Sequence, residues 1–265
     1  MMMHKSDDEH DAFSFIAERN NLKMFLAKTN HSGKFKALFE VLFQNMTTAC
    51  FTITENKMAL EARTTQNVLI SVNLPATCFE EYIFNETEPI HIGLGSHINQ
   101  FFKSVKNKST ITFTMSKPFI FDIEIGSPID DYVVSLSAVI ESMQNIAPTI
   151  HEKYNSKAIP VSGTNFNQIC KAFKSPILNI TKKNGQLQFS FEVSGISTKT
   201  LSFGKKNLQD TNLFHQAFHS DQFSRIGKIS SFVSEPIMIF AEGNKSLFLN
   251  CVSDIGTMKV FMLPV

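Results

Sequence analysis

The chain has 265 residues, 43% hydrophobic and 18% charged, with a formal net charge of +1. This composition is globular and large enough for a substantial core, in one large or two medium domains. The balanced charge excludes a strongly basic protein, so any argument for a nucleic-acid partner depends on where the charges lie.

The four cysteines, Cys50, Cys78, Cys170 and Cys251, are widely spaced in apolar contexts and form no CxxC pair. This pattern predicts buried thiols in a reducing compartment rather than disulfides or a zinc site. No apolar run reaches the roughly 18 residues that span a bilayer, and the polar start is unlike a signal peptide. We therefore expect an intracellular protein, nuclear or cytoplasmic, without a membrane partner.

The N-terminal half begins with residues 1–20, which are acidic and aperiodic and are expected to form a disordered leader. A strand-like segment, residues 22–29, precedes an amphipathic helix over residues 32–46, whose first turn Ser32 can cap. Short β-branched and aromatic runs over residues 49–84 then predict antiparallel strands separated by polar turns.

A second helix is predicted from His97 to Lys108, because Ile98, Phe101, Phe102 and Val105 recur at i, i+3, i+4 and i+7. An ordinary surface helix has the same pattern. Three strand-like segments follow, at residues 109–115, 119–126 and 131–137. Residues 138–160 follow neither period and are interpreted as a connector.

The same order of elements restarts at Val161. Residues 162–176 predict a third helix, and Asn184-Gly185 predicts a tight hairpin turn. Residues 220–233 predict a fourth helix, weakened by Gly227, before the closing strand-like segments.

The helical stripes start at residues 35 and 98 in one half and at 166 and 223 in the other, so the separations are 98 − 35 = 63 and 223 − 166 = 57. This repetition predicts an internal duplication. The fold class is α+β, with a first domain over residues 21–137 and a second over 161–265, each carrying two helices on one face of antiparallel sheets.

The outward positions of these helices are biased toward basic residues. In a chain with 25 basic and 24 acidic residues, such a bias predicts a shared anionic partner. Only Glu40 and Asp221 oppose it. The candidate contacts are Lys36, Lys103, Lys106, Lys171, Lys174, Arg225 and Lys228, with Lys34 nearer a helix flank.

The chain from Met24 to Pro264 resembles the sliding clamps of the proliferating cell nuclear antigen (PCNA) type. The segment Leu38–Tyr82 is similar to the first helix, the Ala-Cys strand and the following strands of that family. Weaker similarities are SGTNFNQIC (Ser162–Cys170) and SDIGTMKVFMLP (Ser253–Pro264). The 26 phenylalanines and the lack of tryptophan suggest a divergent, viral member.

The resemblance implies a duplicated DNA-clamp fold with helices lining a central hole and sheets outside. It implies a non-enzymatic processivity factor, without catalytic residues or cofactors, that encircles double-stranded DNA and tethers DNA polymerase and repair enzymes, with a clamp loader to open the ring. The basic residues named above would contact phosphates without reading sequence, so binding would weaken with salt.

The resemblance also implies a pocket for short hydrophobic peptides of client proteins. The positions that correspond to it are Asn67, Val68, Ile70, Met143, Ile146, Pro148, Phe261 and Pro264. Closing the edge of the core would account for the same side chains. Arg63 and Asn67 stand where the family has methionine and histidine, so client specificity is expected to differ.

Ring closure in the family pairs edge strands of neighbouring protomers. The segments that correspond here are Phe119–Gly126 and Ser197–Phe203, which implies a homotrimer; a monomeric clamp-like factor is the alternative. The interface candidates are Phe119, Phe121, Ile123, Thr198, Thr200 and Leu201.

Two other functional classes are alternatives to a DNA clamp. A transcription or regulatory factor that kept the clamp fold is one, and an enzyme is the other, although no pair of carboxylates or nucleophile motif favours catalysis. His215 and His219 are four residues apart, as helical metal ligands can be, but no third ligand is near them in sequence, so no metal is expected.

Overall fold

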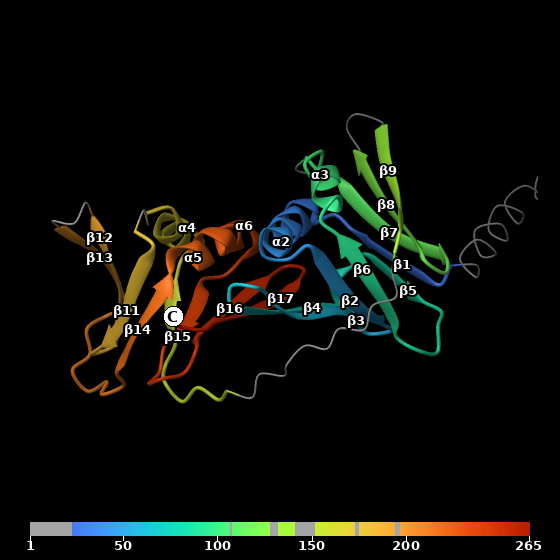
Figure 1. The fold of residues 1–265 in the computed structure, drawn as a ribbon. Helices are drawn as coiled ribbons and strands as arrows, with labels where there is room; N and C mark the ends of the chain where they lie inside the picture. The colour runs from blue at the N-terminus through green and yellow to red at the C-terminus, as the bar shows by residue number, and fades with distance from the viewer. Residues whose placement is uncertain (1–22, 107, 128–131, 141–151, 173–174, 194–196) are drawn as a thin grey trace, which may run out of the picture.

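The computed structural model describes residues 23–106, 108–127, 132–140, 152–172, 175–193 and 197–265. The expected leader and residues 141–151 of the expected connector lie outside these residues. The described strands form three antiparallel sheets, and the helices lie together along one side of them (Figure 1).

The first sheet belongs to the N-terminal half and stands at one end of the molecule (Figure 1). Its edge strand β9 ends at Val139, two residues beyond the predicted domain boundary at residue 137. In sheet order the strands are β5 (Glu81–Phe84), β1 (Phe25–Thr29), β7 (Thr110–Lys117), β8 (Ile120–Ser127) and β9 (Tyr132–Val139).

The second sheet has eight strands and runs through both halves of the chain. Its halves are joined where β17 pairs with β4, in a register that sets Met262 against Val68 and Thr257 against Asn73. In order the strands are β10 (Ile159–Val161), β15 (Ile237–Phe240), β16 (Leu247–Ser253), β17 (Gly256–Met262), β4 (Val68–Pro75), β3 (Lys57–Arg63), β2 (Thr48–Thr54) and β6 (Ile90–Gly95).

The third sheet belongs to the C-terminal half and stands at the opposite end (Figure 1). Asn184 and Gly185 join two of its strands with φ values of 52° and 75°, which confirms the predicted tight turn. In order the strands are β13 (Ser197–Phe203), β12 (Gln186–Val193), β11 (Ile177–Lys183) and β14 (Phe214–His219).

The helical layer consists of α2 and α3 from the N-terminal half and α4, α5 and α6 from the C-terminal half. Helix α2 contacts α3 on one side and α5 and α6 on the other, and α4 contacts α5 and α6. The bounds are α2 (Ser32–Asn45), α3 (Ile98–Phe102), α4 (Gly163–Ala172), α5 (Ser220–Ile226) and α6 (Ile229–Phe232), with a 3₁₀ turn η1 (Ala76–Cys78) between β4 and β5.

Three details of the predicted helices are wrong. Helix α3 ends at Phe102 rather than Lys108, and the Ser104 hydroxyl donates to the Phe101 carbonyl in place of a further turn. Ser32 lies inside α2 and its hydroxyl donates to the Lys106 carbonyl, so it is not the cap. The fourth helix is divided at Gly227 into α5 and α6.

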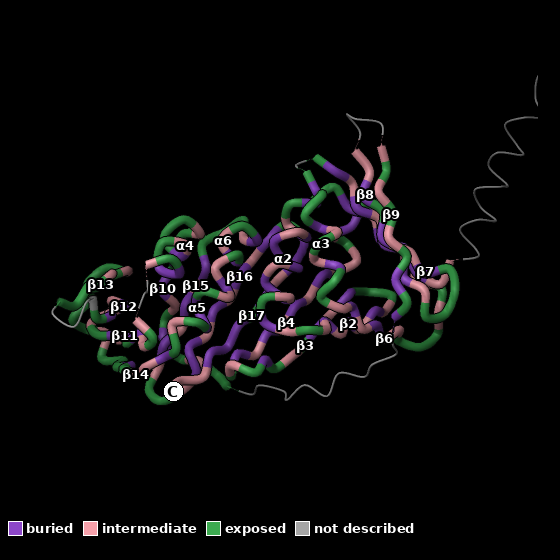
Figure 2. Tube along the Cα trace, turned by 45° about the horizontal axis from the view of Figure 1, so that its top comes forward, coloured by how far each residue is buried: buried purple, intermediate pink, exposed green. Residues whose placement is uncertain are grey.

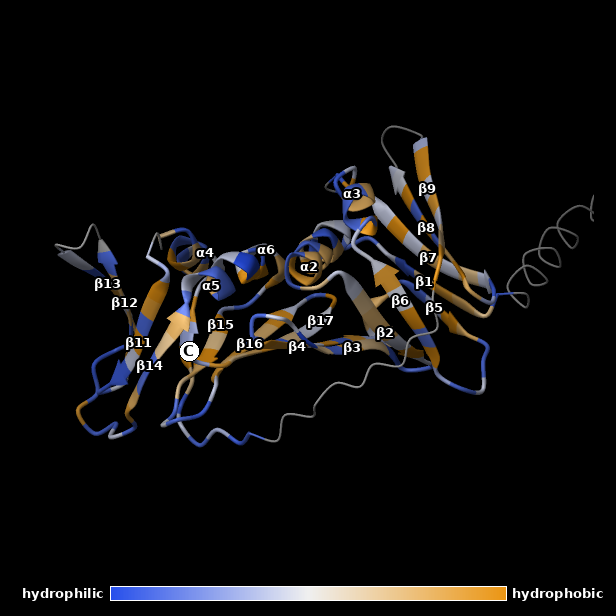
Figure 3. Cartoon of the chain, viewed as in Figure 1, coloured by the Kyte–Doolittle hydropathy of each residue, from blue (hydrophilic) through white to orange (hydrophobic). Residues whose placement is uncertain are grey.

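The core lies between the helical layer and the sheets, as the buried stretches along both show (Figure 2). Strands such as β4 and β16 alternate buried and half-buried residues, so one face of the sheet packs inward (Figure 3). Phenylalanines fill much of the N-terminal core: the Phe39 ring stacks on Phe102 with centroids 4.3 Å apart, and Phe35 and Phe113 are 5.4 Å apart. The predicted helical stripes therefore do face the sheets.

The edge of the first sheet differs from the prediction. Strand β8, which carries Phe121 and Ile123, pairs with β7 on one side and β9 on the other, and both side chains are fully buried. Among the described strands, the outermost ones of this sheet are β9 and β5. The sequence predicts both β8 and β9 as strands, but it does not show which of them lies at the edge of the sheet. The order of strands is set by which strands pair with one another.

Candidate nucleic-acid interface

The helical layer brings most of the predicted basic residues onto one side of the molecule. They divide into two groups by what their side chains contact. One group lies where α2 packs against α5 and α6, a contact between the two halves that we call the central seam. The other lies on α3 and α4, at the two ends of the layer (Figure 1).

Lys34 crosses the central seam. Its Nζ donates to the carbonyl of Val233, the C-terminal cap of α6, at 2.7 Å. Burial lowers the pKa of Lys34 below its ordinary value of 10.5, and the nearby Asp254 carboxylate partly opposes that shift. The ammonium therefore has a structural partner in the other half of the chain.

Arg225 crosses the seam in the opposite direction. Its Nη1 donates to the Gln44 carbonyl in the last turn of α2 at 2.9 Å, and its Nε donates to Asp221 at 2.7 Å. The Asn45 amide returns a bond of 3.2 Å to the Arg225 carbonyl. Both helix ends are thus tied to the other half.

Lys228 and Lys36 make two further links. Lys228 Nζ lies 2.9 Å from a carboxylate oxygen of Glu40, across the seam. Lys36 Nζ donates to the carbonyls of Lys103 and Val105, both at 3.3 Å, where α3 ends. The carbonyls at a helix C-terminus lack partners within the helix and carry partial negative charge, so Lys34, Arg225 and Lys36 stabilise three helix ends.

The basic residues at the ends of the layer are different. Lys103 and Lys171 are exposed, and their side chains have no polar partner among the described residues. Lys106 is exposed, with its Nζ 5.4 Å from the centre of the Tyr132 ring. Lys174 lies outside the described residues. The ends of the layer therefore present cations that can meet phosphate.

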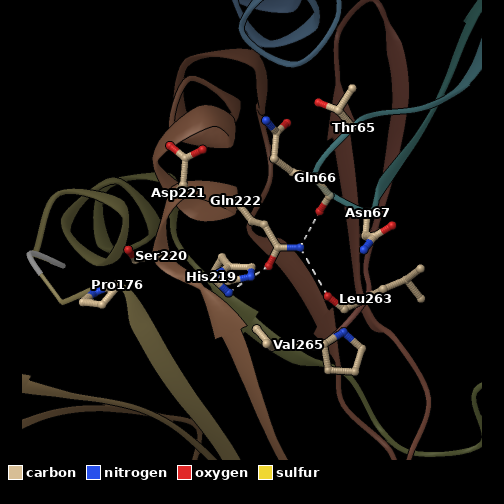
Figure 4. A pocket seen from close by; sticks show the side chains of 11 residues that line it. Thr65, Gln66, Asn67, Pro176, His219, Ser220, Asp221, Gln222, Leu263 and Val265 are labelled. Carbon is tan, nitrogen blue, oxygen red and sulfur yellow. Dashed lines mark hydrogen bonds between the residues drawn. The ribbon is translucent and has the colours of Figure 1, made fainter.

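A second candidate site is a cleft of about 610 Å³ where the two halves meet beside the C-terminus (Figure 4). Two of the predicted partner-binding residues, Asn67 and Pro264, line it. The other lining residues are Thr65, Gln66, Pro176, His219, Ser220, Asp221, Gln222, Leu263 and Val265.

Gln222 organises this cleft. Its side chain is buried, and its Nε2 donates to the carbonyls of Gln66 at 2.8 Å and Leu263 at 3.2 Å (Figure 4). Its Oε1 accepts from the His219 amide at 3.2 Å. One amide group therefore joins three segments, a role that sequence analysis missed because its partners are distant in the chain.

The remaining predicted partner-binding residues are placed differently. Val68 and Ile70 are buried in the core. Their burial agrees with the alternative interpretation, in which these side chains close the edge of the core. Phe261 is 8% exposed and stacks on Phe248 with centroids 4.4 Å apart. Met143, Ile146 and Pro148 lie outside the described residues.

Phe261 ends a row of aromatic rings across β15, β16 and β17, on the face of the sheet opposite the helices. Phe240 and Phe248 are 5.0 Å apart, and the Tyr154 ring lies 5.3 Å from Phe248. Residues 152–156 are thus fixed over this row. Sequence analysis did not identify it, since the rings become neighbours only through strand register.

A polar network holds the same segment. Glu242 accepts from the amides of Asn155 at 2.7 Å and Ser156 at 2.8 Å, and from Lys245 at 2.8 Å. The bonds from Lys245 and from Ser156 lower the pKa of Glu242 to about 2. The carboxylate therefore stays ionised, and the anchor persists, at any physiological pH.

The predicted interface residues occupy the two ends of the molecule. Phe119 is 56% exposed, whereas Phe121 and Ile123 are interior. Thr198, Thr200 and Leu201 lie on β13, which is a free edge of the third sheet. The two free outer edges, β9 and β13, are therefore at opposite ends (Figure 1).

His215 and His219 lie on strand β14, not on a helix, and four strand steps separate them by about 13 Å. No cluster of three metal-ligating side chains occurs among the described residues. Within that same part of the chain, no helix is both long and apolar enough to cross a bilayer.

Residues 24–122 match the family described as proliferating cell nuclear antigen, N-terminal domain. The chain is 23% identical over 244 residues to "Uncharacterized protein 084R" of Frog virus 3 (isolate Goorha), which covers 88% of this chain and 96% of that protein. Its fold matches the crystal structure of proliferating cellular nuclear antigen from Entamoeba histolytica with a TM-score of 0.79 at 15% identity, over 92% of this chain and 99% of that one. The resemblance to PCNA-type clamps and the duplicated clamp fold are confirmed, and the viral relative is consistent with a divergent viral member.

Proposed function

We propose that this chain is a sliding clamp: a non-catalytic processivity factor that encircles duplex DNA and tethers DNA polymerase and other replication and repair enzymes, in the nucleus or cytoplasm where DNA is replicated. The observation that carries the proposal is the single helical layer on one side of the sheets, with exposed lysines just after α3 and on α4. This arrangement suits a DNA-facing surface, because lysines gathered on one side can contact phosphates without reading the base sequence.

Such a surface binds weakly and without sequence preference. Lys103, Lys106 and Lys171 are set for phosphate contacts that are screened by salt. Each contact breaks and reforms as the duplex moves past. Retention on DNA would then come from the closed ring and not from affinity.

Ring closure is supported by the two outer edges. β9 has eight residues and β13 has seven, so they are matched in length, and each leaves one side of its backbone unpaired among the described strands. Pairing β9 of one protomer with β13 of the next would satisfy both edges. We propose a homotrimer closed in this way and opened by a loader.

Client proteins would bind on the face away from DNA. The half-buried rings of Phe240 and Phe248, which form a row with Phe261, offer an apolar anchor beside residues 152–156, and the cleft beside Asn67 and Pro264 offers polar contacts. Calorimetry with a short client-type peptide should show binding that Phe261→Ala weakens. Equal affinity for both proteins would remove this site.

The decisive experiment compares circular and linear duplex DNA. After loading at low salt and transfer to high salt, the protein should remain on circles and leave linear molecules. Equal loss from both would contradict encirclement. Light scattering of the free protein at micromolar concentration separates a trimer from a monomeric clamp-like factor.

A further inference from the structure

The third sheet has a second cleft at the end that lies away from α5. It has a volume of about 640 Å³ and lies where the 184–185 turn meets the 157–160 segment and the loop after β13. Strand β14 leads from this end, where Phe214 pairs with Lys182, to α5 at its other end. Its five residue steps span about 17 Å, so this end of the sheet lies away from α5 (Figure 1). None of the residues that line the cleft belongs to a helix.

The backbone around this cleft is fixed. The Asn207 amide donates to the Asn184 carbonyl at 2.7 Å, and the Asp210 amide donates to the Asn207 carbonyl at 3.1 Å. Gly204 has a φ of 89°, and a Cβ there would lie 2.7 Å from the Gly185 carbonyl oxygen. Only glycine allows this close approach, so the cleft is formed before any ligand arrives.

A buried lysine lies against the floor of the cleft. Lys182 is 1% exposed, and its Nζ lies 3.4 Å from the Lys157 carbonyl oxygen and 3.7 Å from a carboxylate oxygen of Asp210. A buried ammonium needs such a counter-ion. Asp210 lines the cleft but is committed to Lys182, and it does not neutralise the lysines of the rim.

The rim of the cleft is basic. Lys157 and Lys205 line it, both are exposed, and their side chains have no polar partner among the described residues. Lys183 and Lys206 are also exposed and stand next to lining segments. Several exposed lysines around one cleft favour a ligand that brings carboxylates or phosphates.

The apolar part of the site favours protein over nucleic acid. Leu208 is 74% exposed, between the lining residues Asn207 and Asp210. The lining contains no aromatic ring on which a base could stack. An aliphatic side chain flanked by carboxylates would contact both the leucine and the lysines.

We propose that this cleft binds an acidic, leucine-containing segment of a partner protein, with Lys157 and Lys205 pairing its carboxylates and Leu208 contacting its aliphatic side chain. The site is independent of the helical layer. A partner held here would stay bound whether or not DNA passes the opposite face.

The test uses the full chain and a short labelled peptide of glutamate, leucine and serine, followed by fluorescence anisotropy. Lys157→Gln with Lys205→Gln should weaken binding about 10-fold, since two rim charges are lost. The matched control is Lys57→Gln with Lys117→Gln, which removes two exposed lysines from the other half and should leave affinity unchanged. Equal affinities in the two double variants would overturn the proposal.

Two further arms identify the ligand class. Leu208→Ser should weaken the peptide several-fold but leave a leucine-free version of it unaffected. A DNA oligonucleotide should not compete for the cleft; if it displaces the peptide and loses affinity in Lys157→Gln with Lys205→Gln, the partner is nucleic acid and the proposal fails. Retention on circular DNA should be intact in these variants, so the result is independent of clamp function.

Discussion

The central seam and the ends of the helical layer carry the same residue types on the same side of the molecule. Their cations differ in what they contact. In the seam, Lys34 and Arg225 bind backbone carbonyls of the other half, and Lys228 pairs with Glu40. At the ends, Lys103 and Lys171 are exposed without such partners in the described part of the chain. A basic helix face therefore combines groups that hold the fold with groups free to meet a ligand.

The largest expected effect comes from neutralising the ends. Lys103→Gln, Lys106→Gln and Lys171→Gln together should weaken DNA binding at low salt on the order of 100-fold, because three phosphate contacts are lost per protomer. The slope of log K against log salt should fall by about 2.7 per protomer, 0.9 for each contact. Thermal stability should not change. Binding measured over a salt series checks both statements.

The matched control replaces three exposed lysines of the sheets, Lys57, Lys117 and Lys259, with glutamine. It removes the same charge from other surfaces and should leave the salt slope unaltered. If both triple variants lose the same affinity, the ends of the layer have no special part in DNA binding.

Breaking the seam should act on stability instead. Arg225→Met removes the bond to Gln44 and the ion pair with Asp221 and should cost about 1–2 kcal/mol. For a chain of this size the melting temperature would fall by about 2–8 °C. Calorimetry of this variant beside Arg225→Lys is informative, because lysine keeps the charge but lacks the fork geometry. Full stability of the lysine variant would show that charge alone suffices.

A smaller effect is expected from Lys228 and Glu40. Their charged atoms are 2.9 Å apart, but the lysine side chain is 51% exposed. A double-mutant cycle with Lys228→Gln and Glu40→Gln should give a coupling of about 0.2–1 kcal/mol that declines with salt. A coupling that is zero at low salt would remove this pair from the seam.

The smallest effect is a pH dependence. Because burial lowers the pKa of Lys34 in the folded chain, the unfolded chain holds that proton to higher pH. The free energy of unfolding therefore gains from Lys34 as pH rises from the folded pKa toward 10.5. Lys34→Met should lose this gain, so its deficit relative to wild type should widen over that window in denaturant titrations. If the difference in free energy of unfolding between Lys34→Met and wild type stays constant over this pH range, the burial of the Lys34 ammonium is contradicted.

Sequence periodicity was sufficient for the features that depend on neighbouring residues. The buried stripes of α2 and α4, the turn at Asn184-Gly185 and the strand β13 follow from local spacing. The side of the molecule on which the basic residues lie follows from the same periods.

Features that depend on contacts between residues distant in the chain could not be predicted from the sequence. The partners of Lys34 and Arg225 are 199 and 181 residues away in the chain, so no local pattern separates them from Lys103. Lys36 reaches the carbonyl of Lys103, 67 residues away, and the edge position of β9 depends on the pairing of β8. Gln222 is a polar residue of a type that usually lies on the surface. Only its hydrogen bonds show that its buried side chain joins distant segments of the chain.

The pairing of β17 with β4 has a consequence for how the chain is made. Val68 meets Met262, a separation of 262 − 68 = 194 residues. During synthesis, the edge of β4 that pairs with β17 therefore stays open until about 190 further residues have been made. Contacts this distant slow folding, and an open edge invites pairing with other chains. The C-terminal strand thus acts as the closing step of biogenesis for both halves, and a nascent chain that stops short of it would have no finished N-terminal half.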